Sequence, residues 1–473
     1  MSRFSDRCKY IIRENGTNVY QISKEAPLDC TTLQRMVTGK RLPGKDFVRR
    51  FCDYLRMPET EVEELLALYR IEQIGEHAYY SRKYIKNVFH QLYELENDQA
   101  NQPASRGIYQ HLLNPLLSQQ MSIRCENALL SVLAQCFRSE SSAYIYTNLP
   151  ATQSLIHYIE LLNDRHPKDI EILHLISFCM NGVDNLSNLA ALLTILPFTL
   201  SSALRYTPYF IYNHLGYAEF QNALYPFCLI TREQVLLISG DFQDHLLLED
   251  PAVIKSYADR FQAAIRQTHI LIRKTGTPSE AFHFYKNAAA LPDASIYGIE
   301  YQLCFTNLLR PQDLNDSLQI SVPELSSLQP VIQAMFSQKK TFFYTKEGID
   351  TFCRSGIFYG QAAALLPPLS RSSIRHLLQR YLESRRKDSC YMLKDDIRFP
   401  RHINVEIVDG SQLHIMKING AHGFLILTID EPSICEAFDD FFRSLAKDDD
   451  TCSLQESQDY IREKINELQE SER

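Results

Sequence analysis

The first seventy residues carry the pattern that most restricts how this chain can fold. Five short stretches there place apolar residues at helical spacing, and Gly, Pro or Asn residues stand between them. The stretches cover residues 4–14, 19–26, 30–38, 45–56 and 60–69. Five amphipathic helices in so short a segment must share one core. We therefore predict a compact five-helix bundle for residues 1–75.

The second and third of these helices are joined by a turn of about three residues. Pro27 turns the chain, Asp29 stands at the N-cap position of the third helix, and Gly39 stands at its C-cap. The inward positions of the third helix are apolar, at Leu33, Met36 and Val37. Two short, capped helices joined in this way predict a helix-turn-helix.

Residues 28–43 read Leu-Asp-Cys-Thr-Thr-Leu-Gln-Arg-Met-Val-Thr-Gly-Lys-Arg-Leu-Pro. This run resembles the recognition-helix segment of the XRE family, the Cro and phage-repressor type. The residues that match the family's pattern are Leu28, Thr32, Leu33, Met36, Gly39, Lys40 and Pro43. Two positions depart from it: Val19 replaces a common Gln that binds phosphate, and Val37 replaces a common Glu. The departures leave the fold intact but weaken the expected phosphate contacts.

The resemblance implies sequence-specific binding to double-stranded operator DNA, with the recognition helix in the major groove. Arg35 is the strongest candidate for base reading, because a guanidinium can bond guanine O6 and N7 together. Flanking residues would bind phosphates and set the register. The DNA-binding residues that the resemblance implies are Asn18, Tyr20, Gln21, Cys30, Thr31, Thr32, Gln34, Arg35, Lys40 and Arg41.

The charge is divided unevenly along the 473 residues. The whole chain has a net charge of −8, which taken alone argues against a nucleic-acid binder. Residues 1–57, however, carry twelve Lys and Arg against six Asp and Glu, a net charge of +6, so residues 58–473 carry −14. An acidic body should repel DNA everywhere except at the small basic head.

The rest of the chain predicts a mostly α protein with α/β parts. We expect a helix and linker at 76–105, a helical region at 106–205, and two small α/β units at 206–330 and 331–473. Hairpins are predicted at 227–238 and at 403–417, where Asp409-Gly410 is a strong turn signal. The pattern faintly resembles the phospholipase-D-like effector domains of some regulators, without their catalytic signature.

The two α/β units resemble each other. In each, a strand pair is followed by an acidic residue and a proline that opens a helix, at Asp250-Pro251 and at Glu431-Pro432. Aromatic and acidic residues then recur at the same distances from the proline. We interpret this as an internal duplication, with chance similarity of strand–helix units as the alternative.

Residues 185–204 run for 20 residues without a charge, which is long enough to span a membrane. The stretch contains Asn188 and Pro197, and neither flank carries the basic cluster that orients a span. We therefore predict a buried helix that breaks before Pro197, and no association with a membrane.

No pattern for catalysis, a metal or a cofactor is present. The twelve cysteines form no Cys-x-x-Cys pair, and no Gly-rich phosphate loop or nucleophile elbow occurs. His414 and His422 fit ordinary strand residues better than metal ligands, because no acid or Cys stands at ligand spacing. Aromatic clusters at 206–212 and 342–344 fit a core better than a ligand pocket.

These features predict a bacterial or phage transcription regulator. We expect it in the cytoplasm, because free thiols without a secretion signal indicate a reducing compartment. It would act as a homodimer, with a body that senses a small molecule or peptide. Three alternatives stay open. The helix-turn-helix could recruit protein partners in phage defence or toxin control, the body could be a peptide-sensing helical repeat, or the head could be fused to an enzyme.

Overall fold

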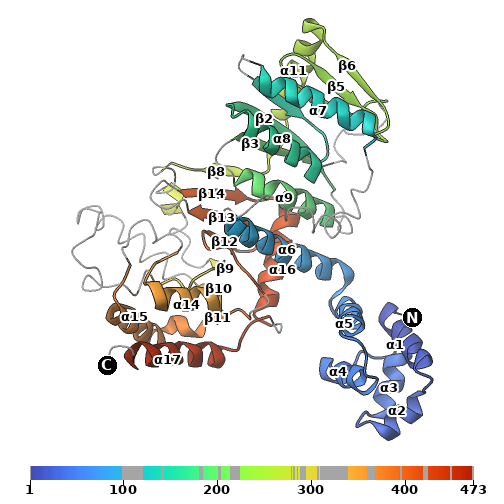
Figure 1. Ribbon diagram of the computed structural model, residues 1–473, viewed down its shortest axis with the longest axis vertical. Helices are drawn as coiled ribbons and strands as arrows, with labels where there is room; N and C mark the ends of the chain where they lie inside the picture. Colours follow the sequence, from blue (N-terminus) through green and yellow to red (C-terminus); the bar gives the residue numbers. More distant parts are fainter. Residues whose placement is uncertain are drawn as a thin grey trace. The chain divides into compact units, whose positions relative to one another are not determined.

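The chain divides into two compact units, residues 1–83 and residues 84–473 (Figure 1). The structure is a computed structural model. It describes residues 2–98, 121–139, 143–179, 185–200, 204–212, 224–277, 294–305, 339–359, 368–394, 397–418, 424–447 and 450–470, together with a few single residues between 280 and 308.

The first unit contains the five helices that the sequence predicts. They are α1 (Arg3–Glu14), α2 (Val19–Glu25), α3 (Cys30–Val37), α4 (Lys45–Tyr54) and α5 (Glu59–Ile74), followed by the start of α6 (Glu76–Asp98). Ser2, Asn18 and Asp29 cap α1, α2 and α3 by accepting backbone N–H groups. Local capping and apolar spacing therefore define where these helices begin.

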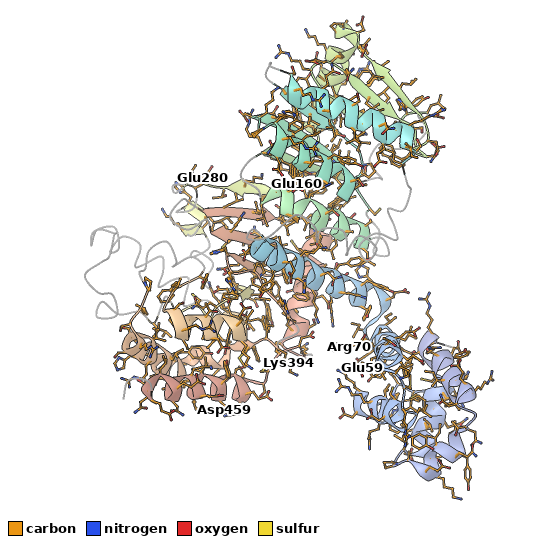
Figure 2. All side chains as sticks on the ribbon, viewed as in Figure 1. Glu59, Arg70, Glu160, Glu280, Lys394 and Asp459 are labelled. Carbon is orange, nitrogen blue, oxygen red and sulfur yellow. The ribbon has the colours of Figure 1, made fainter. Side chains whose placement is uncertain are left out.

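The core of the first unit is built from the apolar helix faces that the sequence indicates. The buried side chains include Phe4, Cys8, Ile11, Ile22, Leu33, Met36, Val48, Phe51 and Leu65. Tyr69 closes this core: its ring meets Phe4 edge-on at 5.6 Å, and its hydroxyl donates to the carbonyl of Pro43 at 2.9 Å. Charged side chains such as Glu59 project from the surface (Figure 2).

The second unit contains two seven-stranded mixed sheets. The first has the order β6-β5-β4-β1-β2-β3-β7 and consists of β1 (Ala143–Thr147), β2 (Ile170–Phe178), β3 (Arg205–Tyr212), β4 (Phe227–Ile230), β5 (Val235–Ile238), β6 (His245–Leu248) and β7 (His269–Ile270). The second has the order β11-β10-β9-β12-β13-β14-β8 and consists of β8 (Arg273–Thr275), β9 (Ser295–Glu300), β10 (Lys339–Tyr344), β11 (Cys390–Met392), β12 (Ile403–Val408), β13 (Gln412–Ile418) and β14 (Phe424–Ile429).

Six strands of each sheet follow one topology. In the first sheet β1, β2 and β3 are parallel neighbours, and β4, β5 and β6 continue from β1 as an antiparallel meander. In the second sheet β9, β10 and β11 are the parallel neighbours, and β12, β13 and β14 continue from β9 in the same way. The sheets differ only in the seventh strand, which pairs with β3 in one and with β14 in the other.

The helices of the second unit connect and cover these sheets (Figure 1). They include α7 (Ile123–Arg138), α8 (Gln153–Arg165), α9 (Asn185–Thr199), α11 (Pro251–Ile265), α14 (Lys346–Ser355), α15 (Arg371–Glu383), η4 (Arg385–Asp388), α16 (Pro432–Leu445) and α17 (Leu454–Glu470). Helix α11 follows β6 and α16 follows β14, and each begins at the proline noted in the sequence. The two similar sequence segments thus form helices at equivalent places after two sheets of like topology, which we call the first and second repeat.

The boundaries of the repeats differ from the predicted ones. Residues 106–205 are not helical throughout, because β1 and β2 lie there and are central to the first sheet. Strand β9 lies before residue 330 but belongs to the second sheet. Strand β2 has apolar residues on both faces, and such a run cannot be told from a buried helix by spacing alone. Both predicted hairpins are confirmed, as β4–β5 and β12–β13.

Residues 185–199 of the uncharged stretch form α9, and this helix does not break before Pro197. Pro197 lies inside the last turn, and the backbone N–H of Leu200 still donates to the carbonyl of Leu196 at 3.0 Å. A proline near a helix end removes only one hydrogen bond, which buried packing can offset. Within the part of the chain that the structure describes, every helix is too short or too polar to cross a membrane.

The linker predicted after residue 97 lies largely outside the described residues. Helix α6 extends to Asp98, and the division between the two units falls inside it, between Lys83 and Tyr84. From Tyr84 onward α6 belongs to the second unit: Phe89 packs against Phe399 and Phe441. The helix predicted for residues 77–97 is thus confirmed by α6, while the polar linker predicted after it stays a prediction.

Candidate nucleic-acid interface

Helix α3 is fixed at its start by Asp29. The Asp29 carboxylate accepts the backbone N–H of Thr32 at 2.7 Å, and its hydrogen bonds with Thr32 lower the pKa of Asp29 below its usual range. A charged N-cap carboxylate also interacts favourably with the helix dipole. The helix therefore begins at one defined residue, Cys30.

Gly39 reverses the chain at the end of α3. Its φ of +69° lies in the left-handed region, and the backbone N–H of Lys40 donates to the carbonyl of Arg35 at 2.9 Å. A Cβ at this position would approach the Ser5 hydroxyl to 3.2 Å. The reversal holds the backbone of Lys40 and Arg41 against the last turn of α3, beside Arg35.

The outer face of α3 is polar. Cys30, Thr31, Gln34 and Arg35 are exposed, and their spacing places them on one side of the helix. Thr32 is half-buried at the edge of this face. The opposite side is formed by the buried residues of the core, so α3 cannot rotate without exposing them. The structure thus brings together the residues that the sequence assigns to base contacts.

The candidate phosphate-binding residues fall into two groups. Asn18 and Gln21 bind each other: the Asn18 amide donates to Gln21 Oε1 at 2.9 Å and accepts the Gln21 backbone N–H at 3.0 Å. The side chains of Tyr20, Lys40 and Arg41 are exposed, with Tyr20 70% exposed. Helix α2, which carries Tyr20 and Gln21, contacts α3.

The acidic residues next to this surface are engaged. Glu25 accepts the Tyr54 hydroxyl at 2.6 Å, and Asp29 caps α3. The exposed cations of α3 and the following turn therefore determine the local charge. Sequence reasoning missed Thr38, which ends α3 and donates its hydroxyl to the carbonyl of Gln34 at 2.7 Å. Its spacing of four residues from Gln34 was the available signal.

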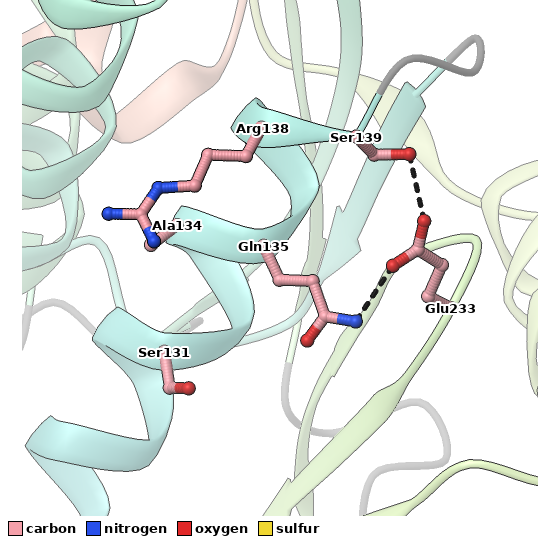
Figure 3. A pocket seen from close by; sticks show the side chains of 6 residues that line it. All are labelled: Ser131, Ala134, Gln135, Arg138, Ser139 and Glu233. Carbon is pink, nitrogen blue, oxygen red and sulfur yellow. Dashed lines mark hydrogen bonds between the residues drawn. The ribbon is translucent and has the colours of Figure 1, made fainter.

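A shallow depression lies at the end of α7 in the second unit. It is lined by Ser131, Ala134, Gln135, Arg138, Ser139 and Glu233 (Figure 3). The Glu233 carboxylate accepts Ser139 Oγ and Gln135 Nε2, both at 2.8 Å, and these bonds lower the pKa of Glu233. Arg138 points away from Glu233 (Figure 3). The contacts fasten the β4–β5 turn to α7 and assemble no nucleophile or base.

Two histidines, His174 and His414, are buried within the sheets. His174 lies fully buried on β2, within 2.9 Å of the Tyr206 hydroxyl and 2.7 Å of the Leu149 carbonyl. His414 lies buried on β13 beside Thr428, and His422 lies outside the described residues. Among the described residues no three His, Cys, Asp or Glu side chains gather as metal ligands.

The aromatic clusters belong to the core, as the sequence indicates. Tyr206, Phe343 and Tyr344 are at most 1% exposed. Tyr206 lies under α9, where Phe198 meets it edge-on at 4.8 Å. Tyr209 and Tyr212 of the first cluster are half-buried.

Comparison with known proteins places the chain in no family. No family model matches the sequence, and no curated protein matches it. Among solved structures, a phosphatidylserine synthase from Haemophilus influenzae Rd KW20 aligns with a TM-score of 0.25 and 10% identity, covering 69% of this chain and 85% of the synthase. A polyphosphate kinase from Porphyromonas gingivalis aligns with a TM-score of 0.24 and 11% identity, covering 72% of this chain and 54% of the kinase. Likeness at this level supports no conclusion about activity.

Proposed function

We propose that this chain is a cytoplasmic, sequence-specific DNA-binding transcription regulator that reads operator DNA through α3. One observation carries the proposal: the exposed side of α3 gathers Cys30, Thr31, Gln34 and Arg35, and Lys40 and Arg41 follow directly at its end. A capped helix with a polar outer face and cations at its end is suited to a groove lined by phosphates.

In this arrangement α3 enters the major groove and Arg35 donates two hydrogen bonds to a guanine. Lys40, Arg41 and Tyr20 bind phosphates and fix the register of the head on the duplex. Asn18 and Gln21 exchange their mutual hydrogen bond for phosphate oxygens. The body, residues 84–473, carries a net charge of −11 and would be repelled by DNA, so that only the head binds.

The body, residues 84–473, would supply the dimer contacts and respond to a small-molecule or peptide effector. Two heads related by two-fold symmetry read two half-sites one helical turn apart, which doubles the number of bases contacted. Mixed sheets in both repeats give the body a different architecture from a helical peptide-sensing repeat.

Substituting Arg35 tests the proposal directly. A duplex is selected from a random-sequence pool with the wild-type chain, and binding is then measured on it and on an unrelated duplex. Arg35→Ala should weaken binding to the selected duplex by about 1–3 kcal/mol, roughly 5- to 150-fold, because the bidentate guanine contact is lost. Binding to the unrelated duplex should weaken far less.

The matched control is Arg13→Ala. Arg13 is exposed in the last turn of α1, so this substitution removes the same charge from a helix other than α3. It should reduce binding to both duplexes equally and slightly. If Arg35→Ala weakened binding to both duplexes equally, Arg35 would contact only the DNA backbone. If no sequence is enriched from the pool at moderate salt, DNA reading is wrong, and recruitment of a protein partner by the same surface takes its place.

A further inference from the structure

The two sheets end in four edge strands, and three of them are protected against pairing with another chain. The outer side of β11 is covered, because Cys452 N–H donates to the Met392 carbonyl at 2.8 Å. Strand β8 carries Arg273 and Lys274, and β7 has only two residues. Strand β6, at the outer end of the first sheet, has none of these features (Figure 1).

The pairing register shows which backbone groups of β6 face outward. Ser239 N–H donates to the Asp244 carbonyl at 2.9 Å, which makes these two residues a hydrogen-bonded pair in the continuous β5–β6 register. Hydrogen-bonded and non-hydrogen-bonded pairs alternate in antiparallel sheets. The N–H and C=O groups of His245, Leu247 and Glu249 therefore point away from β5, and within the described chain no strand pairs with them.

Exposed apolar side chains gather at the same edge. Leu246 and Leu247 are 44% and 43% exposed, one on each face of the strand. Ile123, at the first position of α7, is 76% exposed. It lies near the edge, because its neighbour Ser122 bonds the carbonyls of Phe242 and Gln243 at the entrance to β6. Leucines and an isoleucine at an open strand edge favour association.

We propose that β6 pairs antiparallel with β6 of a second copy of this chain, about a two-fold axis through Leu247. In this register Leu247 faces the partner's Leu247. His245 faces the partner's Glu249, and the two-fold axis makes two such pairs. An imidazole opposite a carboxylate is complementary, and Leu246 opposite the partner's Leu248 adds apolar contact on the other face. The first sheet of one chain and the first sheet of its partner then form one continuous sheet.

This inference rests on the proposed function in one respect: the dimer supplies the two heads that a two-fold operator requires. A four-residue strand with one helix end buries less surface than the roughly 1,200 Å² of a stable interface. We therefore expect a reversible dimer whose population depends on concentration and which binding to two half-sites strengthens.

Sedimentation of the full chain without DNA, over a range of concentrations, tests the interface. Leu247→Lys should raise the dimer dissociation constant about tenfold or more, because two lysines would face each other across the axis. The matched control is Leu161→Lys, another exposed leucine that lies on α8, and it should leave the constant unchanged. Thermal melting of each variant verifies that the fold is retained.

A charge exchange tests the register itself. Glu249→Lys should weaken the dimer, because a lysine would face His245 of the partner in place of a carboxylate. The double variant His245→Glu with Glu249→Lys should restore it, because a carboxylate and an ammonium group then face each other across the pair. A wild-type chain that is monomeric at every soluble concentration, an unchanged Leu247→Lys dimer, or no recovery in the double variant would each overturn the inference. None of these results would contradict the proposed DNA binding, because a monomer with an intact α3 would still discriminate a half-site from unrelated DNA.

Discussion

At the scale of single residues, His174 shows how this fold holds a polar side chain without using it for chemistry. Both ring nitrogens lie within hydrogen-bond distance of oxygens, and the side chain is 1% exposed. Burial lowers the pKa of His174 to about 4, because the interior disfavours the charged imidazolium. The residue therefore stays neutral in the folded protein at pH values where an unfolded chain binds a proton.

This difference predicts acid sensitivity. The unfolded chain protonates His174 below about pH 6.5, whereas the folded chain resists protonation down to about pH 4. The stabilising contribution is thus complete above pH 6.5 and is lost as the pH falls toward 4. Between pH 7 and pH 5 the wild-type free energy of unfolding should fall by about 2 kcal/mol more than that of His174→Gln. Urea denaturation of the second unit at both pH values measures it.

The control is His157→Gln, an exposed histidine on α8, which should keep the wild-type pH dependence. Parallel pH profiles for wild type and His174→Gln would show that His174 does not contribute to acid sensitivity. His414 has a lowered pKa of about 4 from the same cause, so the double variant should be flatter still.

At the scale of elements, the two repeats use equivalent helix starts differently. Asp250 caps α11 at the surface by accepting the backbone N–H groups of Ala252 and Val253. Glu431 caps α16 from a position only 1% exposed, and it also accepts the hydroxyls of Tyr212 and Ser433, both at 2.6 Å. Burial, together with the hydrogen bond to Glu431, raises the pKa of Tyr212.

The Glu431 network joins the two repeats. Asn188 at the start of α9 donates to Ser433 at 3.1 Å, and α9 contacts α16. The carboxylate therefore links β3 and α9 of the first repeat to α16 of the second. Both repeats have an acidic cap at the equivalent helix, and of these two caps Glu431 is the one that lies between the repeats.

The two caps should differ in their effect on stability. Asp250→Ala should cost about 1 kcal/mol, the usual effect of a lost surface N-cap. Glu431→Ala should cost roughly 3 kcal/mol, because two half-buried hydroxyls and a buried backbone N–H lose their acceptor. Denaturant unfolding of both variants side by side makes the comparison. Equal costs would show that the buried network has no stabilising effect beyond its cap.

At the scale of the whole molecule, the chain has separate cores in residues 1–83 and 84–473. Phe51 is fully buried in the first core, and Phe441 is fully buried in the second, where it meets Phe89 of α6 at 5.8 Å. Separate cores imply separate cooperative transitions.

Calorimetry of the full chain should therefore show two unfolding transitions. Phe51→Ala should lower the midpoint of one, and Phe441→Ala should lower the midpoint of the other, since each removes about 3–5 kcal/mol from its own core. Neither substitution should move both transitions equally. A single transition that both variants shift together would mean that α6 couples the two cores into one cooperative unit.

The sequence by itself determined the elements whose signals are local. Caps such as Asp29 and Gly39, with apolar positions three and four residues apart, defined the helices of the head and the exposed face of α3. The Asp409-Gly410 pair defined the β12–β13 hairpin, where both residues have positive φ. In these cases the interacting residues are close together in the chain.

Only the tertiary structure decided the rest. The parallel pairing of β1, β2 and β3 joins residues about thirty positions apart, and β2 carries apolar residues on both faces, so no local period marked it as a strand. The assignment of β9 to the second sheet, the buried position of Glu431 and the open edge at β6 depend likewise on which segments become neighbours. Such pairings are set by the packing of the whole unit, which sequence spacing does not record.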